Sequence, residues 1–172
     1  NAGGGVEEFL ADHAMIVMAD HSQAPVTATI SLQDRLAELG VLGPSGAPGE
    51  VGRDGIEPRI AVCPSQRAAM VYALHESQRD AMRASVAGMA LSMDGVDLVL
   101  WLERDAHEQP REAVIASPAG GELRFCPGSG TLDARGRGWS IEGELAVLGA
   151  ELRDGELVAP DYPDALARAW SA

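Results

Sequence analysis

The chain has 172 residues, with 26 acidic side chains against 13 basic ones, so its formal net charge is -13. This balance argues against a nucleic-acid-binding or membrane-binding protein, because both need a basic surface to displace counterions from phosphates. Hydrophobic residues make up 46% and charged residues 23%, which is typical of a globular domain and not of a disordered chain. We therefore expect a single domain over residues 1–172 that buries a core.

The N-terminal third predicts two helices and one buried strand. A short helix is expected over residues 6–12. The apolar run AMIVMA at 14–19 lacks polar alternation, which is typical of a strand covered on both faces, as in a parallel sheet. Ser31 is a suitable N-cap for a helix that reaches Leu39, where a glycine follows. The stretch 43–58 is rich in Gly and Pro and is expected to be a flexible loop within the domain.

The remaining two thirds alternate between strand-like and helical patterns. A methionine-rich helical stripe marks the longest helix and is typical of core packing. Gly-containing turns between apolar segments indicate hairpins. In chain order we expect strands at 59–63 and 68–74, a helix over 76–93, a buried strand at 96–102, hairpins over 113–126 and 151–158, and a helix from Asp161 to Trp170. The predicted class is α/β with an antiparallel, hairpin-rich subregion towards the C-terminus.

Asp20 and His21 directly follow the apolar run at 14–19. In open α/β sheets, ligands bind beyond the carboxyl ends of the strands, so a buried strand would bring this pair to such an edge. A carboxylate oxygen and an imidazole nitrogen together suit zinc and similar divalent ions. Alternatively, Asp20 caps the next element and His21 is an exposed loop residue. The residues alone leave both interpretations open.

The phrase FLADHAMIVMADHSQ resembles a segment of the alkaline phosphatase superfamily in which a short helix and a hydrophobic strand end in an Asp-His-Gly metal motif. It is most similar to the type I phosphodiesterase and nucleotide pyrophosphatase branch. The later phrases GVDLVLWL, GGELRFCPG, DARGRGW and DYPDALARAW look like the tail of bacterial members, so the resemblance extends over most of the chain. It implies an α/β fold with an alkaline-phosphatase-like mixed sheet and helices on both of its faces.

The same resemblance implies a phosphodiesterase or phosphatase that uses two divalent metal ions, usually zinc. By that resemblance Asp20 and His21 would bind the ion that also activates a Thr or Ser nucleophile. The nucleophile and most other ligands lie further upstream in the family, which agrees with a chain that opens at Asn1. We therefore expect the C-terminal portion of a longer α/β hydrolase domain, inactive alone, whose substrate is a small phosphate ester or nucleotide-like molecule. Ser22 stands where the family has Gly, and Ser allows the backbone fewer conformations at this position than Gly does.

Other candidate residues carry weaker signals. The family's last metal-binding His normally precedes Gly, whereas His75 and His107 each precede Glu, so neither is assigned a role. His75 ends a predicted strand, while His107 and His13 are expected to face solvent from loops. The stretch from Arg135 to Trp139 could bind a phosphate through its arginines, but an exposed turn is favoured.

The two cysteines, Cys63 and Cys126, match no zinc-binding spacing, and both are expected as half-buried thiols at strand ends. Whether they pair is left open, as are the compartment and the oligomeric state. Two alternatives to the hydrolase also stay open. One is a non-catalytic α/β binding or interaction domain in which Asp20 and His21 are structural, and the other is a degenerate paralogue that has lost part of the metal site.

Overall fold

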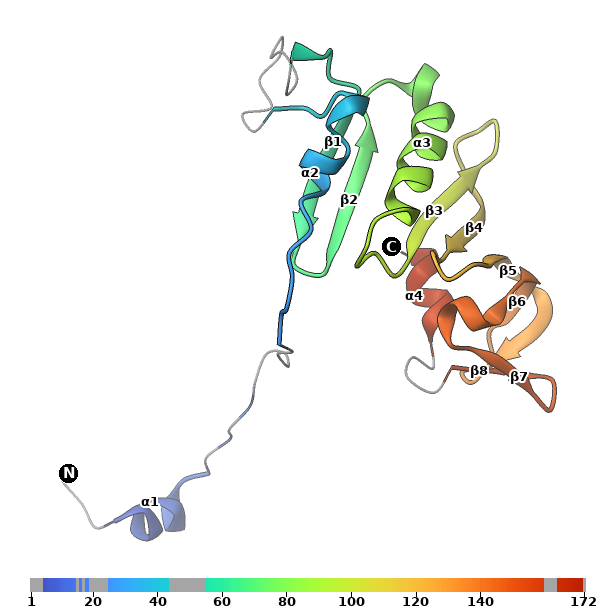
Figure 1. Ribbon diagram of the computed structural model, residues 1–172. Helices are drawn as coiled ribbons and strands as arrows, with labels where there is room; N and C mark the ends of the chain where they lie inside the picture. Colours follow the sequence, from blue (N-terminus) through green and yellow to red (C-terminus); the bar gives the residue numbers. More distant parts are fainter. Residues whose placement is uncertain are drawn as a thin grey trace.

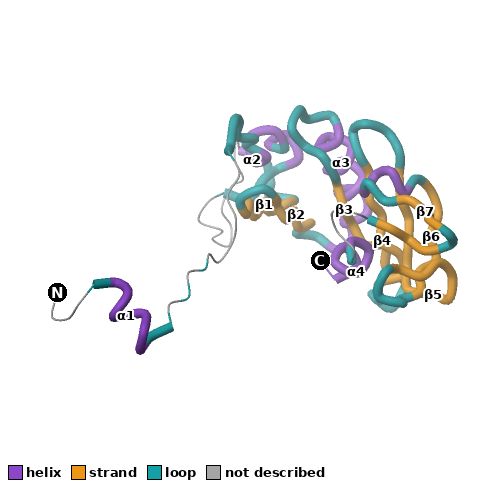
Figure 2. The backbone as a smooth tube through the Cα atoms, turned by 90° about the horizontal axis from the view of Figure 1, so that it is seen from below, coloured by secondary structure: helices purple, strands orange, loops and turns teal. Residues whose placement is uncertain are grey.

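The computed structural model describes residues 5–14, 16, 18, 25–43, 55–159 and 164–171 (Figure 1). Its class is mixed α/β, with two open sheets of two and six strands and few helices. In both Figure 1 and Figure 2 the strands β1, β2, β3 and β4 follow one another in that order across the molecule. None of the described helices is long and apolar enough to cross a membrane.

The two-stranded sheet is an antiparallel hairpin of β1 (Ile60–Ser65) and β2 (Ala68–Ala73). The sequence predicted these two strands, at 59–63 and 68–74, but not their pairing. Its inner face packs on α2 (Leu32–Arg35), which a 3-10 turn (Ala37–Leu39) follows. Of the helix predicted over 31–39, residues 32–35 are therefore α-helical and residues 37–39 form a 3-10 turn. The predicted signals at its ends are confirmed: the Ser31 hydroxyl accepts a hydrogen bond from the Asp34 N–H, and Gly40 has a φ of 74°.

The longest helix is α3 (Arg79–Leu91), preceded by a 3-10 turn at Glu76–Gln78. It packs against both β2 and β3, and it lies along the interval between these strands in Figure 1. Its methionines confirm the core interpretation of the helical stripe. They join the Ile60 cluster, which we define as the buried residues Leu36, Val41, Ile60, Val62 and Met82 with Val71, Val86, Met89, Met93 and their partly buried apolar neighbours.

The six-stranded sheet has the order β3-β4-β5-β8-β7, and β6 also pairs with β5. All its pairs are antiparallel except β5 with β8. The parallel sheet that the apolar runs predicted is therefore not formed by the described residues. Its strands are β3 (Val99–Arg104), β4 (Pro110–Ala116), β5 (Glu122–Asp133), β6 (Gly138–Gly143), β7 (Glu151–Arg153) and β8 (Glu156–Val158). The hairpins predicted at 113–126 and 151–158 are confirmed.

Two details of this sheet correct the sequence predictions. The strand expected at 96–102 starts only at Val99, and Leu98 and Leu100 are exposed rather than buried. The stretch Arg135–Trp139 is only partly a turn, because β6 begins at Gly138 and Trp139 is buried within it. Gly138 is needed at this point, since a Cβ there would lie 2.1 Å from the carbonyl oxygen of Gly128.

Helices lie on both faces of the six-stranded sheet. Glu103 of β3 forms an ion pair with Arg83 of α3 on one face. The neighbouring positions point to the opposite face, where α4 (Ala165–Ser171) packs through Leu166. We call this second core the Phe125 cluster; its buried residues are Ala113, Ile115, Leu123, Phe125, Trp139, Ala150, Leu157, Ala159 and Leu166.

The N-terminal helix α1 (Val6–Asp12) forms where predicted and lies apart from the rest of the structure (Figure 1). Three residues of the apolar run at 14–19 are described, namely Ala14, Ile16 and Met18, and all three are outside strands and exposed. Ile16 and Met18 are 82% and 84% exposed. In the structure the described residues of this run therefore do not form the predicted buried strand. Most of the expected loop at 43–58, and the predicted helix start at Asp161, lie outside the described residues.

Candidate functional site

Asp20 and His21, the predicted metal ligands, lie outside the described residues. Their assignment therefore stays a prediction. In the part of the chain that is described, no group of three or more His, Cys, Asp or Glu side chains could hold a metal ion.

His75 and His107 come from two neighbouring loops at one end of the structure. His75 follows β2 and is the N-cap residue of the 3-10 turn that leads into α3. His107 lies in the turn between β3 and β4, where its N–H donates a hydrogen bond to Asp105 Oδ1 at 2.8 Å. Both side chains are exposed. The carboxyl ends of β2 and β3 thus lie at the same end of the molecule (Figure 1).

An arginine–glutamate pair joins these two loops. The Arg79 guanidinium at the start of α3 donates two hydrogen bonds to the Glu108 carboxylate beside His107, one of them at 3.0 Å. This side-chain hydrogen bonding lowers the pKa of Glu108, against the smaller opposing effect of desolvation. Both side chains face solvent, so the pair positions the loops but contributes little to stability.

His13 is placed by a local contact. Its ring stacks on the Phe9 ring at a centroid distance of 4.4 Å, and its Nδ1 lies 3.1 Å from the Phe9 carbonyl oxygen. The residue is exposed, as predicted. These contacts hold His13 at the end of α1.

The most constrained carboxylate among the described residues is Asp133, for which the sequence predicted no role. It ends β5, is 3% exposed and accepts four hydrogen bonds. Oδ1 accepts from the backbone N–H groups of Arg135 and Arg137 at 2.9 and 3.0 Å. Oδ2 accepts from Arg137 Nε at 2.8 Å and from the Trp139 indole at 3.1 Å. The only sequence signal was an Asp two residues before an Arg-Gly turn, where such side chains bond to the following backbone.

This environment fixes the charge of Asp133. Burial alone would raise the pKa of its carboxyl, but the hydrogen bonds from Arg137, Trp139 and Arg135 together lower it to about 2. The carboxylate is therefore ionised at neutral pH and has both oxygens occupied by donors. Asp133 holds the turn between β5 and β6 and has no free oxygen for a metal ion.

A shallow hollow of about 380 Å³ lies beside this turn. Its wall includes Asp133, Asp154 and Glu156, together with Gly130 and Gly136. Arg137 follows Gly136 in the chain. Its Nη2 atom is buried and has no hydrogen-bond partner within the described residues. Arg137 is thus bonded within the protein, to Asp133, whereas Arg135 is exposed and lies 3.9 Å from Asp164. This supports the predicted turn over a phosphate site at this point.

The two cysteines are both free. Cys63 is exposed and lies within β1, and Cys126 is half-buried within β5. Only Cys126 therefore agrees with the expected half-burial, and neither lies at a strand end.

Comparisons of the chain with family models, with curated proteins and with solved structures gave no match.

Proposed function

We propose that the chain is part of a two-metal phosphodiesterase or phosphatase of the alkaline phosphatase superfamily, in which Asp20 and His21 bind one of the two divalent ions. The observation that carries the proposal is the phrase FLADHAMIVMADHSQ, in which a helix and an apolar run precede the Asp-His pair. The mixed α/β class, with helices on both faces of a sheet, is compatible with this proposal. The substrate would be a small phosphate ester or nucleotide-like molecule.

The donor chemistry of this pair fits zinc. One carboxylate oxygen and one imidazole nitrogen are both common zinc ligands, and the remaining ligands would come from outside the described residues. A bound divalent ion would polarise a phosphoryl oxygen and stabilise charge that develops on it. Asp20 and His21 themselves would hold the ion, and a neutral imidazole is required for this, so zinc affinity should fall as His21 becomes protonated at acidic pH.

The sequence contains a matched control for this site. The triplet Ala-Asp-His occurs twice, at residues 11–13 and 19–21. The resemblance assigns the metal to the second copy, and His13 in the first copy is held at the end of α1 by its contacts with Phe9, so we expect only the second copy to bind the ion. The test is zinc binding by equilibrium dialysis with metal analysis. Because further ligands are expected upstream, we compare the complete protein that contains this chain with two double variants of it, Asp20→Asn with His21→Gln, and Asp12→Asn with His13→Gln.

Loss of the metal ligands should weaken zinc binding by at least about tenfold, since mutation of residues that only support metal ligands already lowers metal affinity by about 10–100-fold. The Asp12/His13 variant should bind like the parent. In the complete protein that contains this chain, the Asp20/His21 variant should also lose hydrolysis of a chromogenic phosphodiester. Equal zinc affinity of all three proteins, or a loss in the control variant alone, would contradict the proposal and favour the non-catalytic binding domain.

A further inference from the structure

The two sheets present free edges to each other. Among the described residues, β2 pairs only with β1, and β3 pairs only with β4. Because the four strands follow in the order β1, β2, β3, β4 in both Figure 1 and Figure 2, the unpaired edges of β2 and β3 both face the interval between them. No described strand lies in this interval, and α3 packs against the strands on both sides of it.

The backbone of β2 has hydrogen-bonding groups directed at this interval. Arg59 and Leu74 form a bonded pair, with Leu74 N at 2.8 Å from Arg59 O. Bonded and non-bonded pairs alternate along an antiparallel ladder, and Pro64, which has no N–H, falls opposite Ala69 at a non-bonded position. The N–H and C=O groups of Ala69, Val71 and Ala73 therefore point away from β1. Free groups of this kind form a template for another strand.

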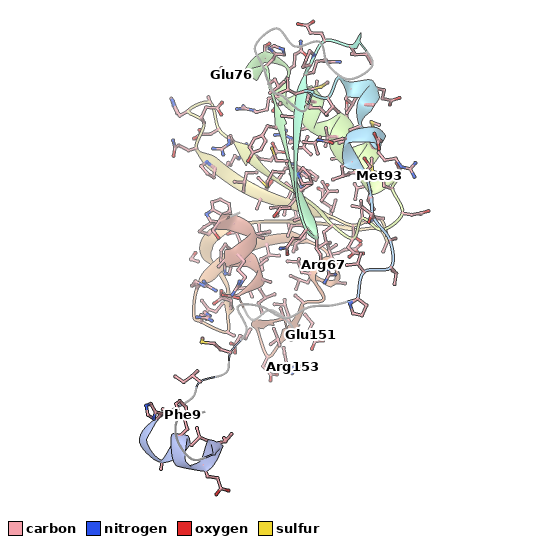
Figure 3. All side chains as sticks on the ribbon, turned by 90° about the vertical axis from the view of Figure 1, so that its left-hand side faces the viewer. Phe9, Arg67, Glu76, Met93, Glu151 and Arg153 are labelled. Carbon is pink, nitrogen blue, oxygen red and sulfur yellow. The ribbon has the colours of Figure 1, made fainter. Side chains whose placement is uncertain are left out.

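β2 lacks the features that protect a free edge. The segment 68–74, AAMVYAL, has no charged residue, Pro or Gly. By contrast, the outer edge strand β7 has three residues, and two of them are the exposed Glu151 and Arg153, which pair with each other (Figure 3). Short length and charge are the usual protection against edge pairing. On the outer face, Met70 and Tyr72 of β2 and Leu100 of β3 are 49%, 51% and 37% exposed.

The apolar run at 14–19 matches this interval. It has six residues and no charge, like β2, and its described members Ile16 and Met18 have almost their whole side chains in solvent. The chain that follows it is already anchored beside the interval. The Ile30 side chain packs against Gly95, where an added Cβ would lie 2.9 Å from Ile30 Cδ1, and Gly95 lies four residues before β3.

The connection is also long enough. Residues 20–29 separate the run from Ile30, and ten extended residues span up to about 35 Å, whereas a six-residue strand is about 20 Å long. We propose that the run at 14–19 adds to the free edge of β2 as a strand in the interval between β2 and β3, and so joins the two sheets into one. This inference does not depend on the proposed hydrolase function.

Hydrogen exchange of the full chain tests it. Amides of Val71 and Ala73 should exchange slowly, and the double variant Ile16→Asp with Met18→Asp should accelerate them by at least about tenfold. A matched variant, Val6→Asp with Leu10→Asp, changes two exposed apolar residues of α1 and should leave these amides unchanged. The amides of β5 and β6 report in each protein that the large sheet is folded.

Three outcomes would overturn the inference. Fast exchange of Val71 and Ala73 in the parent would show an open edge. Equal protection in the Ile16/Met18 variant would show that another segment covers it. Protection that increases with protein concentration, together with a dimer in analytical ultracentrifugation, would show that a second copy of the chain does so.

Discussion

The six-stranded sheet and the β1–β2 hairpin differ in how completely they bury their apolar side chains. In the sheet, Phe125, Leu123 and Ile115 are each at most 2% exposed, because α4 and a 3-10 turn (Leu145–Leu148) cover that face. The hairpin buries Ile60 equally well on its inner face but exposes Met70 and Tyr72 on the other. The sheet has a complete core of its own, whereas the hairpin is packed on one side only.

This difference indicates where the stability of the described structure lies. The Phe125 cluster also contains the edge-to-face contact between Phe125 and Trp139, whose ring centroids are 5.8 Å apart, and such pairs add to simple burial. Trp139 in turn bonds to Asp133. Apolar packing and the buried carboxylate therefore meet at one side chain, Trp139, and substitutions of Phe125 and Asp133 separate their contributions to stability.

The largest effect is expected from Phe125→Ala. Phe125 is 1% exposed, so removing its ring leaves a cavity and should lower the free energy of unfolding by about 3–5 kcal/mol. Chemical denaturation measures the loss. Hydrogen exchange should show that β4, β5 and β6 lose more protection than the β1–β2 hairpin. Leu152→Ala is the matched control, because Leu152 is 55% exposed on β7 and its loss should change stability by no more than about 0.5 kcal/mol. Equal losses in the two variants would contradict a core centred on Phe125.

The sequence predicted hairpins better than it predicted burial. The β4–β5 and β7–β8 hairpins were predicted because each has a clear turn between two strand-like segments, and Asp154-Gly155 is a strong turn signal. Strand β6 was missed because its start, RGRGW, is rich in Gly and charge and shows no alternation. The run at 14–19 was predicted as buried from composition alone, although burial depends on a partner surface that local sequence does not specify.

The positions of the candidate site residues also depend on contacts that local sequence does not specify. Asp133 was missed because an Asp in a Gly-rich turn usually faces solvent, and its burial results from Trp139 folding back over the turn from β6. His75 and His107 are 32 positions apart in the sequence and reach one end of the molecule only through the packing of α3 on β2 and β3. The assignment of Asp20 and His21 as metal ligands stays a prediction.

Asp133→Asn tests the polar part of the sheet region. The substitution removes the negative charge and replaces one accepting oxygen by an NH₂ group, which would then face either two backbone N–H groups or the Arg137 and Trp139 donors. Because the donors on that side lose their accepting oxygen at a position where the carboxylate was buried, the free energy of unfolding should fall by about 3 kcal/mol. Asp154→Asn, at an exposed position on the same hollow, should cost no more than about 0.5 kcal/mol. A small loss in both variants would mean that packing alone holds this turn.

The smallest expected effect is the pH dependence that the same carboxylate produces. The pKa of Asp133 is about 2 in the folded protein against its usual 3.8, so the unfolded chain binds this proton first as the pH falls. The stabilisation is therefore complete above about pH 4 and disappears as the pH falls through about 2, with a total of about 2 kcal/mol. Urea denaturation of the parent and of Asp133→Asn across this range measures it. Other carboxylates titrate in both proteins, so the difference between the two curves isolates Asp133: it should narrow by about 2 kcal/mol between pH 4 and pH 2. A constant difference would show that the turn is held without the charge, and that the sheet region differs from the hairpin by its apolar core alone.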